Sequence, residues 1–250
     1  KLIAMTCAKY LKPVVLELGG KAPLVVLDDA DIEDAVNGAA FGCFANSGQI
    51  CMSTERIIVD QKIADEFAKK FADKARNLPL GDPRKPDPVV LGSVIGMSTV
   101  EHCNALVDDA LAKGAKLLCG GKADSTLMPA TVLDHVTPAM RIYHEETFGP
   151  VKCIVRVKNT EEAIACANDN EYGLSAAVFG KDIARAFNVA RKIDSGICHV
   201  NGPTVHDEAQ MPFGGVKGSG IGRFGGKAGI AEFTELRWVT VQTTPRHYPF

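Results

Sequence analysis

The chain has 250 residues, of which 46% are hydrophobic and 23% are charged, and its formal net charge is -2. This length allows one large domain or two modest ones with a sizeable hydrophobic core. The near-neutral charge and the lack of a basic stripe argue against nucleic acid as a partner. No apolar run reaches the roughly 18 residues that a membrane span needs, so we expect no membrane partner.

The eight cysteines are scattered through apolar segments, and no two have the C-x-x-C spacing. A disulfide framework is unusual in a chain of this length, and zinc would need clustered Cys or His ligands. We therefore expect no metal, small buried thiols at most of these positions, and a reducing, cytoplasmic setting. The chain begins with Lys1 rather than Met, within a predicted helix, which indicates a piece of a longer protein.

Segments with the hydrophobic period of a strand alternate along the chain with segments that have the hydrophobic period of a helix. They predict helices over residues 2–11, 31–44, 62–78, 99–113, 182–193 and 228–233, and one more helix capped by Asn159. They predict strands over residues 13–18, 23–27, 56–59, 115–119, 151–157, 175–179, 196–200 and 236–242. Alternation of this kind predicts an α/β fold with a mostly parallel sheet covered by helices on both faces. The segments 79–88 and 201–222 are predicted loops.

Glu17 lies between apolar residues of a predicted strand and is followed by Gly19 and Gly20. A carboxylate at the end of a buried strand is partly desolvated, which raises its pKa and makes it a usable base near neutral pH. Taken alone, the segment favours a capping or salt-bridged glutamate over a catalytic base.

Cys51 follows a helix end and the segment Asn46-Ser47-Gly48, on a loop before a strand. Loops held by rigid elements often carry catalytic groups, and an ionised thiol is a strong nucleophile. The neighbouring glycine and serines leave backbone N–H groups free to stabilise an oxyanion. The alternative is one more buried cysteine, but these small polar neighbours are unusual for a core position.

Two further segments contain suggestive side chains. Residues 144–150 read H-E-E-T-F-G-P and place carboxylates beside an aromatic ring, as a site for sugar hydroxyls would, although an ordinary acidic turn is the alternative. Residues 211–220 are rich in glycine but match no phosphate-binding or dinucleotide fingerprint. We interpret them as a loop that passes close to other backbone.

Four segments, taken together and in this order, resemble the aldehyde dehydrogenase superfamily. They are E-L-G-G-K (17–21), G-Q-I-C (48–51), E-E-T-F-G-P (145–150) and P-F-G-G-V-K (212–217). The resemblance extends over essentially the whole chain. It implies that the Cys51 thiolate attacks an aldehyde carbonyl while its own N–H helps to hold the oxyanion. It implies that Glu17 activates the water that releases the carboxylic acid.

The resemblance also assigns the binding residues. It implies that Glu146, Phe148 and Gly19 bind the cofactor, which is NAD or NADP with NAD favoured. Ile50, Met52 and Phe213 would form the wall of the substrate pocket. Phe224 follows Gly222-Arg223, where many relatives carry glutamate, and this variant resembles the branch acting on aromatic aldehydes, such as salicylaldehyde, benzaldehyde and vanillin.

The resemblance further implies a domain arrangement. Residues 1–20 would be the last elements of a Rossmann-like cofactor domain, 21–216 the catalytic domain, 217–235 a return segment, and 236–250 an oligomerisation strand and tail. Most of the cofactor domain and a second oxyanion donor would lie upstream, so we expect this chain to be inactive by itself. The small-molecule partner would be an aldehyde, and the full-length protein a homo-oligomer, either dimer or tetramer, although the terminal strand could equally pair within its own chain.

Three alternatives remain. A CoA-dependent acylating relative also uses a loop cysteine, but an intact E-L-G-G-K segment favours hydrolysis. A non-catalytic structural or oligomerising module of the same fold is disfavoured by the joint presence of Cys51, Glu17, Glu146 and Phe148. A thiol hydrolase lacks an evident histidine partner.

Overall fold

A seven-stranded sheet forms the centre of the fold, with the strand order β4-β5-β6-β3-β2-β8-β9. The computed structural model describes residues 1–250. Only the pair β4–β5 is antiparallel, and the other neighbouring strands run parallel. The predicted α/β fold with a mostly parallel sheet is therefore confirmed. The strands are β2 (Ala22–Val26), β3 (Thr54–Asp60), β4 (Lys116–Cys119), β5 (Thr131–Asp134), β6 (Val151–Val157), β8 (Ser175–Phe179) and β9 (Ile197–Val200).

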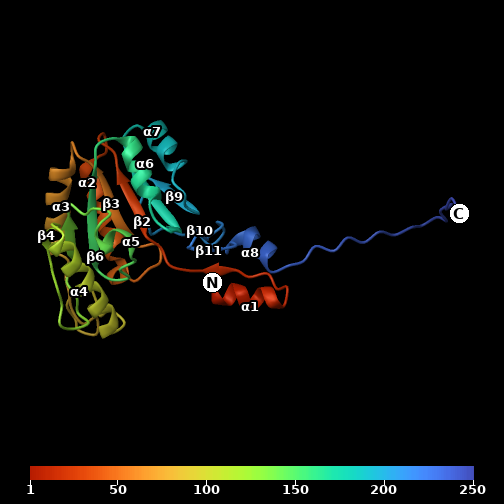
Figure 1. Ribbon diagram of the computed structural model, residues 1–250, viewed down its shortest axis with the longest axis horizontal. Coiled ribbons are helices and arrows are strands. Elements are labelled where there is room, and N and C mark those ends of the chain that lie inside the picture. The colour runs from red at the N-terminus through yellow and green to blue at the C-terminus, as the bar shows by residue number, and fades with distance from the viewer.

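Helices cover both faces of this sheet (Figure 1). One hydrophobic cluster joins the sheet to α2 (Ile32–Phe44) and α3 (Ala64–Arg76). The other joins it to α4 (Met97–Ala112), α5 (Arg141–His144), α6 (Thr160–Asn168) and α7 (Ile183–Ala190). Successive side chains of a strand point to opposite faces, so Leu24 and Val26 enter the first cluster while Val25 enters the second.

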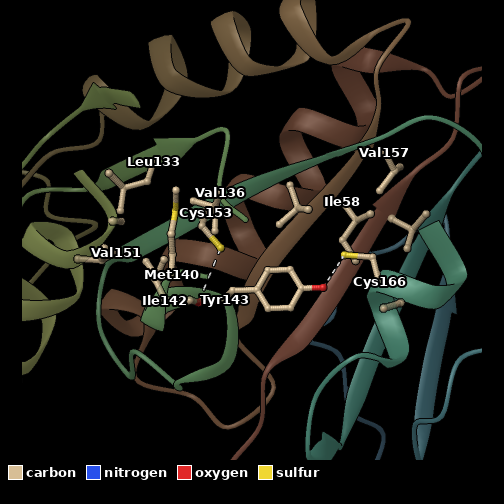
Figure 2. Packing of buried hydrophobic residues seen from close by; sticks show 14 of the residues in the cluster. Ile58, Leu133, Val136, Met140, Ile142, Tyr143, Val151, Cys153, Val157 and Cys166 are labelled. Atoms are coloured by element: carbon tan, nitrogen blue, oxygen red, sulfur yellow. Dashed lines mark hydrogen bonds between the residues drawn. The ribbon is translucent and has the colours of Figure 1, made fainter. Parts of the chain in front are cut away.

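Tyr143 of α5 lies in the second cluster and points towards Cys166 of α6 (Figure 2). Its hydroxyl is 3.4 Å from the Cys166 Sγ and 3.1 Å from Asp169 Oδ2. The Arg56 guanidinium covers the tyrosine ring at 4.8 Å from its centroid. Cys153 and Cys166 are thus small buried residues, as expected, and all eight cysteines are free.

Side-chain caps fix the starts of two helices. Asp31 accepts hydrogen bonds from the N–H groups of Glu33 and Asp34, and Asn159 accepts one from Glu162. Both predicted caps are confirmed. The sequence patterns did not predict β5 and α5, which have four residues each.

The segment predicted as one glycine-rich loop contains two short strands, β10 (Val216–Lys217) and β11 (Gly220–Ile221). They pair antiparallel with β7 (Tyr172–Gly173) and β1 (Leu16–Glu17), respectively. The predicted close backbone approach is confirmed, because a Cβ at Gly220 would collide with the Leu16 carbonyl oxygen. Gly220 also has φ +148, a conformation that side chains rarely adopt.

The two ends of the chain lie outside the layered body (Figure 1). Helix α1 (Leu2–Lys9) buries none of its residues, and α8 (Gly226–Glu232) precedes an extended tail. The strand predicted over residues 236–242 is wrong for this chain, since the tail forms no regular structure. It leads away from both edges of the sheet, so its backbone finds no strand to pair with. No helix combines the length and hydrophobicity required to cross a membrane.

Candidate active site

Three of the four predicted site segments precede three neighbouring strands of the sheet. Residues 17–21 lead into β2, Cys51 leads into β3, and residues 145–150 lead into β6. These strands are adjacent and parallel in the order β6-β3-β2, so their amino ends meet at one edge. In most open α/β sheets the ligand lies at the carboxyl ends of the strands. Here the candidate site lies at the opposite edge.

Cys51 is carried by a tight turn after α2. Asn46, Ser47 and Gly48 have φ values of +50, +57 and +73, so three consecutive residues adopt the left-handed conformation. Such a run reverses the chain sharply at the cost of local strain. The Ser53 hydroxyl donates to the Gly42 carbonyl at 3.0 Å and ties the far side of the turn to α2. Cys51 is consequently half-buried at a fixed position.

The electrostatic surroundings of Cys51 include Glu17. Burial raises the pKa of the Cys51 thiol, and the nearby Glu17 carboxylate raises it further. Backbone N–H groups of Met52 and of Cys51 itself lower the pKa of this thiol. These two N–H groups donate to no backbone carbonyl, so they remain able to hold an oxyanion next to the sulfur.

Glu17 is placed beside Cys51 by the short pairing of β1 with β11. The expectation of a desolvated carboxylate is only partly correct, because the Glu17 side chain is exposed on the described surface. Partial burial still raises the pKa of Glu17, and the Arg223 guanidinium opposes this rise. β1 has only two residues and one strand partner, which leaves one side of Glu17 open.

Gly19, Gly20 and Glu146 form one contact. The Gly20 N–H donates to Glu146 Oε1 at 2.8 Å, and a Cβ at Gly19 would lie 2.7 Å from Glu146 Oε2. The His102 ring Nε2 is 2.9 Å from the Glu146 carbonyl oxygen. Burial raises the pKa of the Glu146 carboxyl, against the hydrogen bond from Gly20. The structure thus brings together two residues assigned separately to cofactor binding.

The other predicted binding residues are less closely gathered. Phe148 is 41% exposed, while Met52 is buried and Ile50 is half-buried. Phe213 pairs with Phe224 through two backbone hydrogen bonds of 2.8 and 2.7 Å. Phe213 lines a cavity of about 560 Å³ whose wall includes neither Cys51 nor Ile50 nor Met52. Phe213 thus does not share this cavity with the other two apolar side chains.

Sequence reading missed a buried cluster of charges directly behind the site. Lys21 Nζ and Lys152 Nζ lie 2.8 and 2.7 Å from the two carboxylate oxygens of Glu55. Thr147 donates its hydroxyl to Glu55 Oε1 at 2.6 Å and its N–H to Oε2 at 2.9 Å. The available signal was the presence of Glu55 and Lys152 just before the apolar run of their strands, Ile57-Ile58-Val59 and Cys153-Ile154-Val155.

The site is therefore a half-buried thiol with free N–H groups, an adjacent carboxylate of raised pKa, and a second carboxylate one strand away. A nucleophile, a base and a hydroxyl acceptor in this arrangement suit covalent catalysis on a carbonyl compound. Residues 1–239 match the aldehyde dehydrogenase family. The chain belongs to this family.

Two relatives illustrate the similarity. The chain is 56% identical over 249 residues to a vanillin dehydrogenase of Pseudomonas fluorescens, covering 100% of the chain and 52% of the relative. It is 53% identical over 249 residues to a salicylaldehyde dehydrogenase of Pseudomonas sp. (strain C18), covering 100% of the chain and 52% of the relative. The chain thus spans about half the length of the curated relatives it matches.

A solved structure agrees with these relationships. The structure of a salicylaldehyde dehydrogenase from Pseudomonas putida G7, complexed with salicylaldehyde, superposes with a TM-score of 0.96 at 53% identity. The match covers 100% of this chain and 51% of that one. The expected family and fold are confirmed.

Proposed function

We propose that this chain is the thiol-bearing part of an aldehyde dehydrogenase that oxidises an aromatic aldehyde to its carboxylic acid with NAD(P)+. The observation that carries the proposal is the placement of Cys51, Glu17 and Glu146 before adjacent strands at one edge of the sheet. In this proposal Cys51 is the nucleophile and Glu17 the general base. The rest of the enzyme corresponds to the half of the relatives that the chain does not span.

Cys51 performs the first step. Its thiolate adds to the aldehyde carbonyl, the carbonyl electron pair moves to oxygen, and a thiohemiacetal results. The backbone N–H groups of Cys51 and Met52 lie beside the sulfur and have no backbone acceptor, so they can stabilise that oxygen. Burial and the Glu17 carboxylate raise the pKa of the thiol, so the reacting thiolate is the minor form of Cys51 near neutral pH.

Glu17 performs the last step. After oxidation, the acyl group remains on Cys51 as a thioester, which water must hydrolyse. A carboxylate with a raised pKa removes a proton from that water more effectively than an ordinary one. The exposure of Glu17 gives water direct access to it. This role favours release of the free acid over transfer to CoA.

Glu146, Gly19 and Phe148 suit a nicotinamide cofactor. When bound, the cofactor supplies the hydride acceptor for oxidation. Glu146 would accept hydrogen bonds from ribose hydroxyls, because its carboxylate is half-buried and Gly20 donates only to Oε1. A side chain at Gly19 would collide with Oε2, so glycine at this position keeps that oxygen from being blocked. The exposed Phe148 ring offers an apolar contact. We favour NAD+, since one relative, 41% identical, is named benzaldehyde dehydrogenase [NAD(+)].

The aromatic substrate class is supported by the names of the relatives, which include vanillin, salicylaldehyde and benzaldehyde dehydrogenases. Ile50 and Phe213 are half-buried and able to contact a ring, whereas Met52 exposes only 8% of its surface. Of the three residues assigned to the substrate wall, we therefore expect Ile50 and Phe213 to contact the ring more than Met52 does.

The test is cofactor-linked oxidation of salicylaldehyde, benzaldehyde and hexanal by the polypeptide that contains this chain. Cys51→Ala should abolish reduced-cofactor formation, while Cys7→Ala, at another half-buried cysteine, should retain it. Glu17→Gln should give a stoichiometric burst followed by slow turnover, because acylation precedes hydrolysis. Activity that survives Cys51→Ala would contradict the assignment, and equally fast oxidation of hexanal would contradict the aromatic preference.

We also propose that the protein is a homo-oligomer and that the tail contributes to the contact. Leu236, Trp238 and Val241 are 105%, 90% and 81% exposed. The backbone of an extended segment can pair with a strand edge of another subunit, and its apolar side chains are then covered by that subunit. Analytical ultracentrifugation of the protein with and without residues 236–250 tests this. The same number of subunits in both forms would contradict the role of the tail.

A further inference from the structure

We propose that Glu55 is a positioning residue, whose buried carboxylate joins the segments carrying Glu17, Cys51 and Glu146 into one rigid unit. The inference rests on the proposed function for its catalytic meaning. Its structural content is independent, because the network links three segments whatever reaction they support.

The geometry of the network is complete. Glu55 is the fifth residue of the run that begins at Cys51, and it is 2% exposed. Both of its oxygens are occupied, Oε2 by Lys21 Nζ and the Thr147 N–H, and Oε1 by Lys152 Nζ and the Thr147 hydroxyl. A carboxylate with four donors has no freedom to rotate without losing charge-assisted hydrogen bonds.

Two partners of Glu55, Lys21 and Thr147, belong to different parts of the candidate site. Lys21 follows Gly20, whose N–H binds Glu146 and whose Cα faces the Cys51 carbonyl, since a Cβ there would lie 2.5 Å from that oxygen. Lys21 also donates to the Glu145 carbonyl at 2.6 Å. Thr147 follows Glu146 directly. A shift of Glu55 would therefore move the supports of Glu146 and Gly20 together.

The cost of the network indicates a role beyond packing. Burying three charges is unfavourable, and apolar side chains of similar size often give equal or greater stability at such positions. The neighbouring residues Ile57, Ile58 and Ile154 are apolar and fully buried, so the sheet could continue without these charges. What apolar residues cannot supply is a directional link between three loops.

The experiment measures alkylation of Cys51 by iodoacetamide across pH, by mass spectrometry of the full chain. The charged groups facing the thiol are Glu17 and Glu146. In Glu55→Gln, looser loops should expose Cys51 and move it away from Glu17, and both changes favour the thiolate. We expect alkylation at pH 7.5 to accelerate by at least about threefold, with the midpoint of the profile at lower pH.

Three variants make this test decisive. Thr147→Val is nearly isosteric and should also accelerate alkylation, which covers the case in which Glu55→Gln does not fold. Lys152→Met removes a charge but leaves the links of Glu55 to Lys21 and Thr147, so its Cys51 profile should stay unchanged. Val189→Ala, in α7, controls for a general loss of stability.

The outcomes separate this inference from the proposed function. An unchanged Cys51 profile in both Glu55→Gln and Thr147→Val would overturn the positioning role. A change of the opposite sign in Lys152→Met would also overturn it, because Glu55→Gln removes a negative charge from the cluster and Lys152→Met removes a positive one, so the charge of the cluster would then be the cause. Neither result depends on aldehyde oxidation, so a failure of the enzymatic assay leaves this test intact.

Discussion

The Gly20 N–H donates to Glu146 Oε1 at 2.8 Å, across 126 positions of sequence. This bond joins the segment that carries Glu17 to the segment that carries Phe148. On its other side, Gly20 faces the carbonyl oxygen of Cys51. Gly20 is therefore the point where the three predicted site segments touch.

Gly20→Ala tests this contact. The added methyl group would lie 2.5 Å from the Cys51 carbonyl oxygen, which is backbone and cannot swing aside. We expect a loss of about 1–3 kcal/mol in the free energy of unfolding, typical of overpacking, measured by urea denaturation. Gly92→Ala is the matched control, because its nearest neighbour would lie 4.0 Å away. Equal stability of the two variants would contradict the close approach.

Glu17→Gln tests the electrostatic coupling to Cys51. The Glu17 carboxylate raises the pKa of the Cys51 thiol, so removing its negative charge should lower that pKa. Alkylation of Cys51 near pH 8 should then accelerate about two- to fivefold, as expected for a partly screened charge nearby. Glu161→Gln, on α6, should leave the rate unchanged. A slower reaction of Cys51 in Glu17→Gln would mean that Glu17 acts mainly by removing the thiol proton.

Glu55→Gln tests how much the buried charges contribute to stability and at which pH. Burial alone would raise the pKa of Glu55, but Lys152 and Lys21 outweigh it and hold the pKa at about 2. The folded pKa is thus depressed below the unfolded value of about 4.3. The contribution of Glu55 is therefore fully present above about pH 4.3 and is lost as the pH falls towards 2.

The expected loss in Glu55→Gln at pH 7 is about 3–5 kcal/mol, because two buried lysines lose their partner. Urea denaturation of Glu55→Gln and of the native chain should show a smaller difference in the free energy of unfolding at pH 3 than at pH 7. Glu66→Gln, which breaks an exposed pair with Lys70, should cost less than about 1 kcal/mol. If the difference in the free energy of unfolding between Glu55→Gln and the native chain grew from pH 7 to pH 3, the pKa of Glu55 would not be depressed.

Asp31→Ala tests the start of the helix that leads to Cys51. The Asp31 carboxylate accepts hydrogen bonds from the Glu33 and Asp34 N–H groups at 3.0 and 3.2 Å. Loss of this cap should cost about 1 kcal/mol in the free energy of unfolding. Asp31→Asn keeps the oxygen acceptor and should be nearly as stable as the native chain. If both variants lose the same amount, the charge of Asp31 and not its hydrogen bonds stabilises α2.

Several features of this protein follow from local sequence alone. The alternation of periods predicted the α/β fold, and Asp31 and Asn159 predicted two helix starts to the residue. The four short motifs predicted the family. These are local properties, because a cap or a periodic face depends on residues within a few positions of one another.

Other features depend on contacts between distant residues. Only the strand order β6-β3-β2 brings the segments before these strands to one edge, and only that edge joins Lys21, Glu55, Thr147 and Lys152. The exposure of Glu17 and the absence of a strand in the tail depend on which surfaces meet. The sequence by itself determined most of the longer elements and the family of this protein. The tertiary structure decided which side chains share an environment, because burial, charge pairing and strand pairing depend on non-local packing.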